Sequence, residues 1–193
     1  MQKPNGYDEA RESGVFTPVE LGGHYAVVKQ VSEKKSSNGK PMIVVLLDFC
    51  KPDPQLGYFT AAFEDDSRDE KKWPFNGSKY IMVQDYKDPN KTSRQFKTFC
   101  SCIEKSNNME ISWGGSDWGK QFKDKKIGVV YGEEENEYDG ERSMRRVPKY
   151  FCQWDKVKDA VIPEPKYLPE ANPAPAPKAP EGFIPVSEDD IPF

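Results

Sequence analysis

Apolar residues are concentrated in two neighbouring stretches of this chain in a way that is typical of β-strands. Residues 24–31 (HYAVVKQV) mix apolar and polar positions, and residues 41–49 (PMIVVLLDF) form a β-branched apolar run. The polar segment between them contains Asn38-Gly39, a dipeptide that favours a tight turn between paired strands. We therefore expect a β-hairpin in this region.

Further segments with strand-like composition follow along the chain. The expected strands are residues 57–63 (GYFTAAF), 79–84, 126–131 (KIGVVY) and 147–154 (VPKYFCQW). The last two are separated by the polar segment EEENEYDG, which we interpret as the connection between them.

One segment instead has the periodicity of an amphipathic helix. Within residues 93–105 (SRQFKTFCSCIEK), Phe96, Phe99, Cys100 and Ile103 occupy positions i, i+3, i+4 and i+7, which lie on a single helical face. Ser93 or Thr92 is a suitable N-cap residue for this helix.

Five strands and one helix predict a mainly β protein. The arrangement fits an OB-fold-like, five-stranded, partly open Greek-key barrel, and a β-sandwich is the alternative. This domain is expected over residues 23–162, after an N-terminal arm (residues 1–22) that packs loosely.

The composition changes abruptly at Pro163. Residues 163–186 alternate Pro and Ala and contain few apolar groups that could offset the entropy of folding, so we expect a disordered, flexible linker. The tail from Pro163 onward has six acids and two lysines, which leaves 26 acidic and 26 basic residues before it. The whole net charge of −4 therefore lies in the tail.

The last seven residues, 187–193 (SEDDIPF), form an acidic tip with apolar side chains. Pro192 restricts the backbone, so that Ile191 and Phe193 lose less entropy when they bind. Such a peptide suits a pocket with an apolar floor and a basic rim. The expected protein-interaction residues are Asp189, Asp190, Ile191, Pro192 and Phe193.

The β-rich body, the Pro-rich linker and the terminal Asp-Asp-Ile-Pro-Phe together closely resemble the bacterial and phage single-stranded DNA-binding proteins. The body lacks the N-terminal strand sequence of the usual bacterial member. It is more similar to small proteins of phage replication modules, in which a Gly-x-Tyr strand (Gly23-His24-Tyr25), a Ser-Asn-Gly-Lys hairpin (residues 37–40), a central helix and a Gly-Lys strand opening recur.

The resemblance implies that the chain binds and protects single-stranded DNA without sequence preference. It also implies that the tip recruits replication, recombination and repair proteins of the host or phage. The alternatives are an adaptor that captures host replication proteins through the tip without binding DNA, and, more remotely, an enzyme such as a nuclease. Binding of oligo-dT by the body separates the first two.

DNA affinity of this kind comes from basic side chains on phosphates and from bases stacked on aromatic rings. Three segments combine both residue types. They are Lys34, Lys35 and Lys40 with Tyr58 and Phe59; Lys71 and Lys72 with Trp73; and Arg142, Arg145, Arg146 and Lys149 with Tyr150. For each aromatic residue, packing in the core is an equally good interpretation.

Other chemistry finds little support in the sequence. The four cysteines lack zinc-site spacing, and the single histidine, His24, excludes mechanisms that need two. Gly114 to Lys120 (GGSDWGK) has the outline of a phosphate-binding loop, but Gln121 replaces the required Ser or Thr. The acidic segment at residues 64–70 is interleaved with basic residues, which favours a solvated loop. We expect no cofactor, no metal, no enzymatic activity, no membrane span and a cytoplasmic location.

Overall fold

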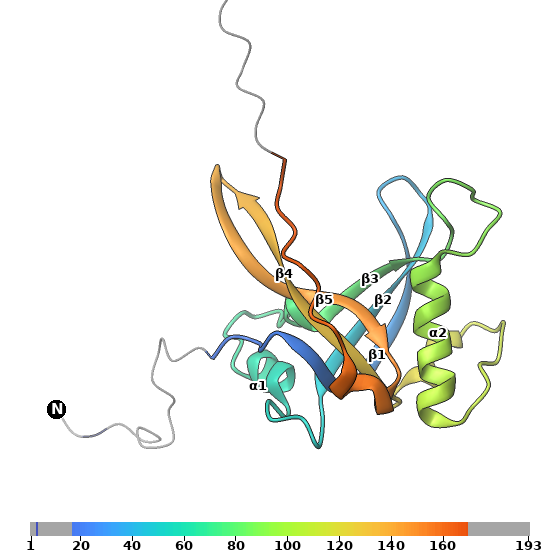
Figure 1. Cartoon of the computed structure of the whole chain (residues 1–193), viewed down its shortest axis with the longest axis horizontal. Helices are drawn as coiled ribbons and strands as arrows, with labels where there is room; N and C mark the ends of the chain where they lie inside the picture. Colours follow the sequence, from blue (N-terminus) through green and yellow to red (C-terminus); the bar gives the residue numbers. More distant parts are fainter. Residues whose placement is uncertain (1–2, 4–16, 170–193) are drawn as a thin grey trace, which may run out of the picture.

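The computed structural model describes residue 3 and residues 17–169. In that part of the chain, five strands form one antiparallel sheet in the order β3-β2-β1-β4-β5 (Figure 1). The strands are β1 (Gly22–Lys35), β2 (Pro41–Phe49), β3 (Ser78–Met82), β4 (Lys126–Tyr138) and β5 (Glu141–Cys152). The helices are α1 (Tyr58–Glu64) and α2 (Arg94–Asn107), with 3-10 turns η1 (Phe75–Gly77), η2 (Trp118–Phe122) and η3 (Trp154–Asp159). The prediction of a mainly β protein is confirmed.

Strand β1 lies at the centre of the sheet and pairs with β2 on one edge and β4 on the other. The hairpin predicted from Asn38-Gly39 is present, and β2 has the predicted bounds. The pairing of β1 with β2 shifts register between Val28 and Gln30, at a β-bulge. A bulge increases local twist, which helps a sheet of this size to curve around a core.

The hairpin of β4 and β5 is much longer than the sequence predicted. Glu133 to Tyr138, expected to be a connection, continue β4, and only Asp139 and Gly140 form the turn. Both turn residues have positive φ, as a tight turn between antiparallel strands requires. We call residues 133–146 the β4–β5 arm. It projects on the same side of the molecule as the β1–β2 hairpin (Figure 1).

Residues 58–64 form α1, so the predictions of a third strand at residues 57–63 and of a single α-helix are wrong. The reason is a cap supplied from outside the segment. Asp48 of β2 accepts hydrogen bonds from the Phe59 backbone N–H (2.9 Å) and from the Thr60 hydroxyl. A carboxylate at these unsatisfied N–H groups stabilises the first helical turn.

Helix α2 confirms the predicted amphipathic segment. The Ser93 hydroxyl oxygen accepts the Phe96 backbone N–H at 3.1 Å, as an N-cap residue does. Phe99 and Ile103 are fully buried against the sheet, with Phe151 of β5 next to Phe99. The core also contains Phe49, Phe59, Phe122 and Tyr131.

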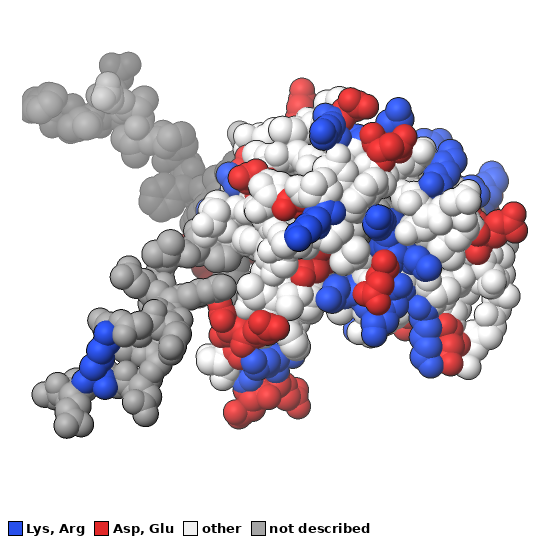
Figure 2. Space-filling view, turned by 90° about the horizontal axis from the view of Figure 1, so that it is seen from below, with Lys and Arg blue, Asp and Glu red and all other residues white. Residues whose placement is uncertain are grey.

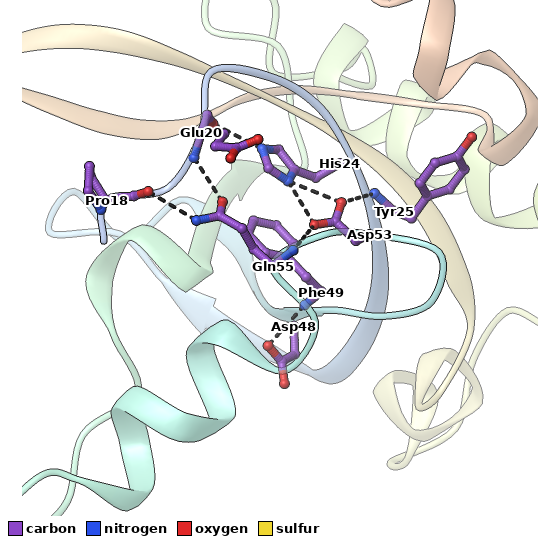
Figure 3. Close-up of polar contacts among 8 residues, drawn as sticks. All are labelled: Pro18, Glu20, His24, Tyr25, Asp48, Phe49, Asp53 and Gln55. Carbon is purple, nitrogen blue, oxygen red and sulfur yellow. Dashed lines mark hydrogen bonds and ion pairs between the residues drawn. The ribbon is translucent and has the colours of Figure 1, made fainter. Parts of the chain in front are cut away.

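The last residues of the predicted N-terminal arm belong to the folded body. Val19 is buried in the core, and the Gln55 side chain bonds the Pro18 carbonyl and the Glu20 N–H (Figure 3). His24 lies between the Glu20 carbonyl and the Asp53 carboxylate. The arm from Pro18 is therefore fixed to the body, which corrects the expectation of loose packing.

The linker predicted to begin at Pro163 is bound to the sheet over its first residues. Lys166 bridges β4: its N–H donates to the Glu133 carbonyl (3.1 Å), and its carbonyl accepts the Glu135 N–H (2.7 Å). The Leu168 N–H donates to the Glu135 carboxylate. We call residues 163–169 the strap. The rest of the predicted linker and the acidic tip lie outside the described residues.

Candidate nucleic-acid interface

The first group of predicted DNA-binding residues lies on the β1–β2 hairpin. Lys34 and Lys35 end β1 and are exposed, and Lys40 follows the turn. The turn is held by the Gly39 N–H on the Ser36 carbonyl (2.9 Å) and by the Ser36 N–H on the Lys40 carbonyl (2.8 Å). We call residues 34–40 the lysine hairpin. It presents three ammonium groups from one short, hydrogen-bonded loop.

An aromatic ring lies beside this hairpin, but it is not one of those predicted. Tyr86, from the segment between β3 and α2, is 89% exposed, and the Lys40 ammonium lies 5.1 Å from its ring centroid. The predicted partners, Tyr58 and Phe59, follow the opposite end of β2. Because the nine residues of β2 span roughly 30 Å, the structure does not bring them to the hairpin.

Phe59 and Trp73 are in fact packing residues. Phe59 is fully buried, which excludes it from a surface that DNA could reach in this structure. Trp73 packs against the core, 5.6 Å from Phe63 between ring centroids, and its indole N–H donates to the Gly77 carbonyl. Tyr58 also packs partly against the core, while Lys72 is exposed beside Trp73. For these aromatics the core interpretation holds.

The third predicted group lies together on β5, where each cation faces a glutamate of β4. The closest contacts are Arg142 to Glu137 (3.2 Å), Arg145 to Glu134 (2.8 Å), Arg146 to Glu133 (3.5 Å) and Lys149 to Glu134 (3.0 Å). The three arginines are the direct cross-strand partners of these glutamates. The arm is therefore a ladder of opposite charges. On the face shown in Figure 2, basic and acidic side chains are likewise interleaved rather than separated.

Glu134 is the centre of the densest part of this ladder. Arg145 donates two hydrogen bonds to one of its carboxylate oxygens, and Lys149 donates one to the other. Partial burial alone would raise the pKa of Glu134, but these hydrogen bonds and charges hold its pKa below the usual value. Glu134 thus occupies the position that an anionic ligand of the two cations would take.

Arg145 contacts an exposed aromatic ring and also lines a cleft. Its guanidinium lies 4.7 Å from the centroid of Phe75, a ring that is 54% exposed. A cleft of about 460 Å³ opens at this point, lined by Phe75, Arg145, Arg146 and Met144 among others. Arginine both stacks on flat rings and binds phosphate in a fixed geometry.

The other cations of β5 have clear structural partners. The Arg146 guanidinium donates to the Val19 carbonyl at 2.7 Å, which ties the N-terminal segment to β5. Arg142 donates to the Pro169 carbonyl of the strap. Tyr150 is partly exposed, and its hydroxyl donates to the Val161 carbonyl.

Six described aromatic residues that are at least half exposed were not among the predicted site residues. They are Phe75, Tyr80, Tyr86, Trp113, Tyr138 and Tyr167. Phe75 and Tyr86 lie over cations that come from other elements of the chain. Only the fold brings ring and charge together, so a search for neighbouring aromatic and basic residues could not find these pairs.

The described residues contain no group of three His, Cys, Asp or Glu side chains that could hold a metal ion. The four cysteines are free, and burial raises the pKa of Cys100 to about 12. No described helix is both long and apolar enough to span a membrane.

No protein-family model matches the chain, and no curated protein matches it.

Proposed function

We propose that this chain binds single-stranded DNA without sequence preference and that its sheet is an OB-type barrel. Three features support the barrel. Strand β1 pairs with both β2 and β4, α2 is inserted between β3 and β4, and the Lys79 ammonium of β3 donates to the Pro148 carbonyl of β5 at 2.7 Å. The last contact links the two edge strands of the sheet.

The main support for the proposal is that a basic side chain lies over an exposed aromatic ring at two places on the body. Lys40 lies over exposed Tyr86 at the β1–β2 hairpin, and Arg145 lies over exposed Phe75 at the β4–β5 arm. In OB folds, the loops between strands 1 and 2 and between strands 4 and 5 flank the surface that binds oligonucleotides. A cation beside an exposed ring can hold a phosphate while the ring stacks on a base.

Strand β3 supplies a surface between these two places. Phe75 precedes β3, and Tyr80, which is half exposed, lies within it. The chain between the two residues spans at most roughly 17 Å, which is within the reach of a few nucleotides of one strand. Bound DNA follows β3 from Phe75 past Tyr80 toward the lysine hairpin.

In this proposal the acidic tip, outside the described residues, recruits replication, recombination and repair proteins in the cytoplasm. The support is chemical: Ile191 and Phe193 offer apolar contact, and Asp189 and Asp190 offer charge. DNA binding by the body and recruitment by the tip would then be separate activities.

The test is a titration of fluorescently labelled oligo-dT with the full chain at several salt concentrations. We expect the logarithm of the binding constant to fall linearly with the logarithm of the salt concentration, because the DNA releases counterions when basic side chains bind its phosphates. In the double variant Lys34→Glu, Lys35→Glu, affinity at about 0.1 M salt should fall by about tenfold, and the salt slope should shrink by about 0.7 for each phosphate that the protein no longer neutralises.

The matched control is Lys156→Glu with Lys158→Glu, which changes the charge of two exposed lysines in η3 by the same amount. It should leave binding near the parent value. Absence of binding by the parent chain at about 0.05 M salt would contradict the proposal and favour the adaptor. Equal losses in the control and the double variant would show that net charge, and not the lysine hairpin, determines affinity.

A further inference from the structure

A pocket of about 360 Å³ opens beside the lysine hairpin, away from the β4–β5 arm. It lies between the first two strands, the start of α2 and the loop after α2. Its walls include Lys34, Met42, Phe96, Trp113 and Trp118. None of its aromatic residues was among the predicted DNA-binding residues, and the proposed path along β3 ends at its edge, because Val83 also lines it.

Three aromatic rings form one side of this pocket. Trp113 and Trp118 are stacked with centroids 5.7 Å apart and planes 25° apart, and Phe96 lies 6.0 Å from Trp118 at 29°. Phe96 and Trp118 are buried, whereas Trp113 is 66% exposed. The buried pair holds an exposed indole at the mouth of the pocket. Such an indole is a platform on which another flat ring can stack.

The indole N–H of Trp118 is buried and has no hydrogen-bond acceptor among the described residues. A buried donor without a protein partner is unusual in folded proteins, and this one reaches a ligand in the pocket only after Trp118 shifts, because its nitrogen is inaccessible to solvent. A nucleobase carries ring-nitrogen and carbonyl acceptors in the plane of a stacking ring. The exposed ring of Trp113 therefore suits a base, and the buried donor would serve that base only after such a shift.

The loop that carries Trp113 has room to receive a ligand. Gly114 and Gly115 directly follow Trp113 and have φ of +91° and +87°, a conformation that favours glycine. A Cβ at either position would meet no atom within 4 Å. The loop is therefore not packed against the rest of the body at these positions.

The charges around the pocket indicate that the ligand is part of a polyanion. Lys34 lines the pocket, and Lys35 and Lys40 stand on the same hairpin. Glu33 also lines it, so the lining itself is neutral, and the positive charge beside the pocket comes from Lys35 and Lys40. An apolar, ring-lined pocket with lysines at one side suits a base attached to a charged backbone.

We infer that this pocket holds one nucleobase of the bound single strand, stacked on Trp113, with a neighbouring phosphate at Lys34. The inference rests on the proposed function and deepens it, because it adds a base-binding position at the end of β3, outside the sheet itself. The pocket binds bases of any sequence, because stacking uses the ring face that all bases share.

The test compares oligo-dT with an abasic oligonucleotide of the same length, which has the phosphates but no bases. For the full chain carrying Trp113→Ala, affinity for oligo-dT should fall roughly 5- to 150-fold, the range of one stacked base. Affinity for the abasic strand should not change. Trp113→Phe keeps a stacking ring and should recover most of the loss. Tyr167→Ala, which removes an equally exposed ring from the strap, is the control.

Intrinsic tryptophan fluorescence gives a second measurement. Oligo-dT should quench the parent protein, and most of this quenching should be absent in Trp113→Phe. Three results would overturn the inference: unchanged oligo-dT affinity in Trp113→Ala, an equal loss for the abasic strand, or quenching of Trp113 by the peptide SEDDIPF but not by oligo-dT. In each case DNA binding by the parent remains a separate result. Failure of the parent to bind either oligonucleotide would instead contradict the proposed function.

Discussion

His24 and Asp53 form a buried pair in which the imidazole Nδ1 lies 3.1 Å from the carboxylate Oδ2, with both side chains almost inaccessible to solvent. The other ring nitrogen, Nε2, lies 2.9 Å from the Glu20 carbonyl oxygen. The same carboxylate accepts the backbone N–H groups of Tyr25 (2.9 Å) and Gln55 (3.0 Å). The pair therefore joins the N-terminal segment, β1 and the loop after β2 at one point (Figure 3).

We predict that Asp53→Ala destabilises the protein more than His24→Phe. Removal of Asp53 leaves the buried His24 Nδ1 and the partly buried backbone N–H groups of Tyr25 and Gln55 without their acceptor, and each buried donor left unsatisfied costs about 1–3 kcal/mol. His24→Phe retains the stacking on Phe49 (4.3 Å between centroids) and should cost about 1–3 kcal/mol. Urea unfolding gives both values. A larger loss for His24→Phe would show that the imidazole, and not the carboxylate, organises this junction.

Arg145 and Arg146 should have different roles although they are adjacent. Arg145→Ala should weaken binding of oligo-dT by roughly tenfold, because it removes the cation above Phe75, with little change in stability. Arg146→Ala should lower the free energy of unfolding by about 1–3 kcal/mol, because its guanidinium holds the Val19 carbonyl. DNA titration and urea unfolding of each single variant separate the two effects. Equal behaviour of the variants in both measurements would contradict this assignment.

Glu134→Gln should strengthen DNA binding at low salt. The substitution removes the charge that competes with phosphates for Arg145 and Lys149 while it keeps the shape of the side chain. The salt slope should become steeper by about 0.7 for each additional phosphate that the two cations neutralise. Glu110→Gln changes an exposed acid outside the arm and serves as the control. Weaker binding by Glu134→Gln would mean that the ladder is needed to shape the arm.

Glu134 should also contribute to stability in a pH-dependent way. Its pKa in the folded state is lowered from 4.5, so the charged form is favoured by folding. The stabilisation is complete above the unfolded pKa and is lost as pH falls through the lower folded pKa. The difference in unfolding free energy between the parent and Glu134→Gln should therefore be present at neutral pH and vanish in strong acid. A difference that grows as pH falls below the unfolded pKa would reverse the sign of this argument.

Phe193→Ala should abolish recruitment of replication and repair proteins without affecting DNA affinity, because Phe193 supplies much of the apolar contact in a short peptide. Asp189→Asn with Asp190→Asn should mainly slow association and reduce its salt sensitivity. Capture of a labelled partner by each variant, beside a DNA titration, is the measurement. Loss of DNA binding in Phe193→Ala would show that the two activities are not separate.

The sequence predicted the elements that depend on local signals. The β1–β2 hairpin follows from its turn dipeptide and apolar run, and α2 follows from its apolar face and the Ser93 cap. Helix α1 was missed because its cap is Asp48, which lies 11 residues before Phe59. The outer part of β4 was missed because its side chains are glutamates. Charged strands become stable only when a partner strand supplies the opposite charges.

The candidate interface was predicted less completely than the fold. The basic residues of the lysine hairpin and of β5 could be named because such residues stand out in sequence, and their contact with DNA stays a prediction. Their aromatic partners were not, since exposure of a ring depends on what packs over it in three dimensions. Phe59 and Trp113 are both aromatic, yet Phe59 is fully buried and Trp113 is largely exposed.

The bridge between Lys166 and β4 fixes the point from which a tether would leave the body. The 24 residues after Pro169 can span at most about 85 Å. If the tip recruits a protein as proposed, that protein would stay within this distance of the β4–β5 arm, and its effective concentration there would depend on the length of the tether rather than on its concentration in the cell. The substitution Lys166→Pro would remove the N–H that donates to the Glu133 carbonyl. Release of this contact would lengthen the tether and lower the concentration of the partner around bound DNA.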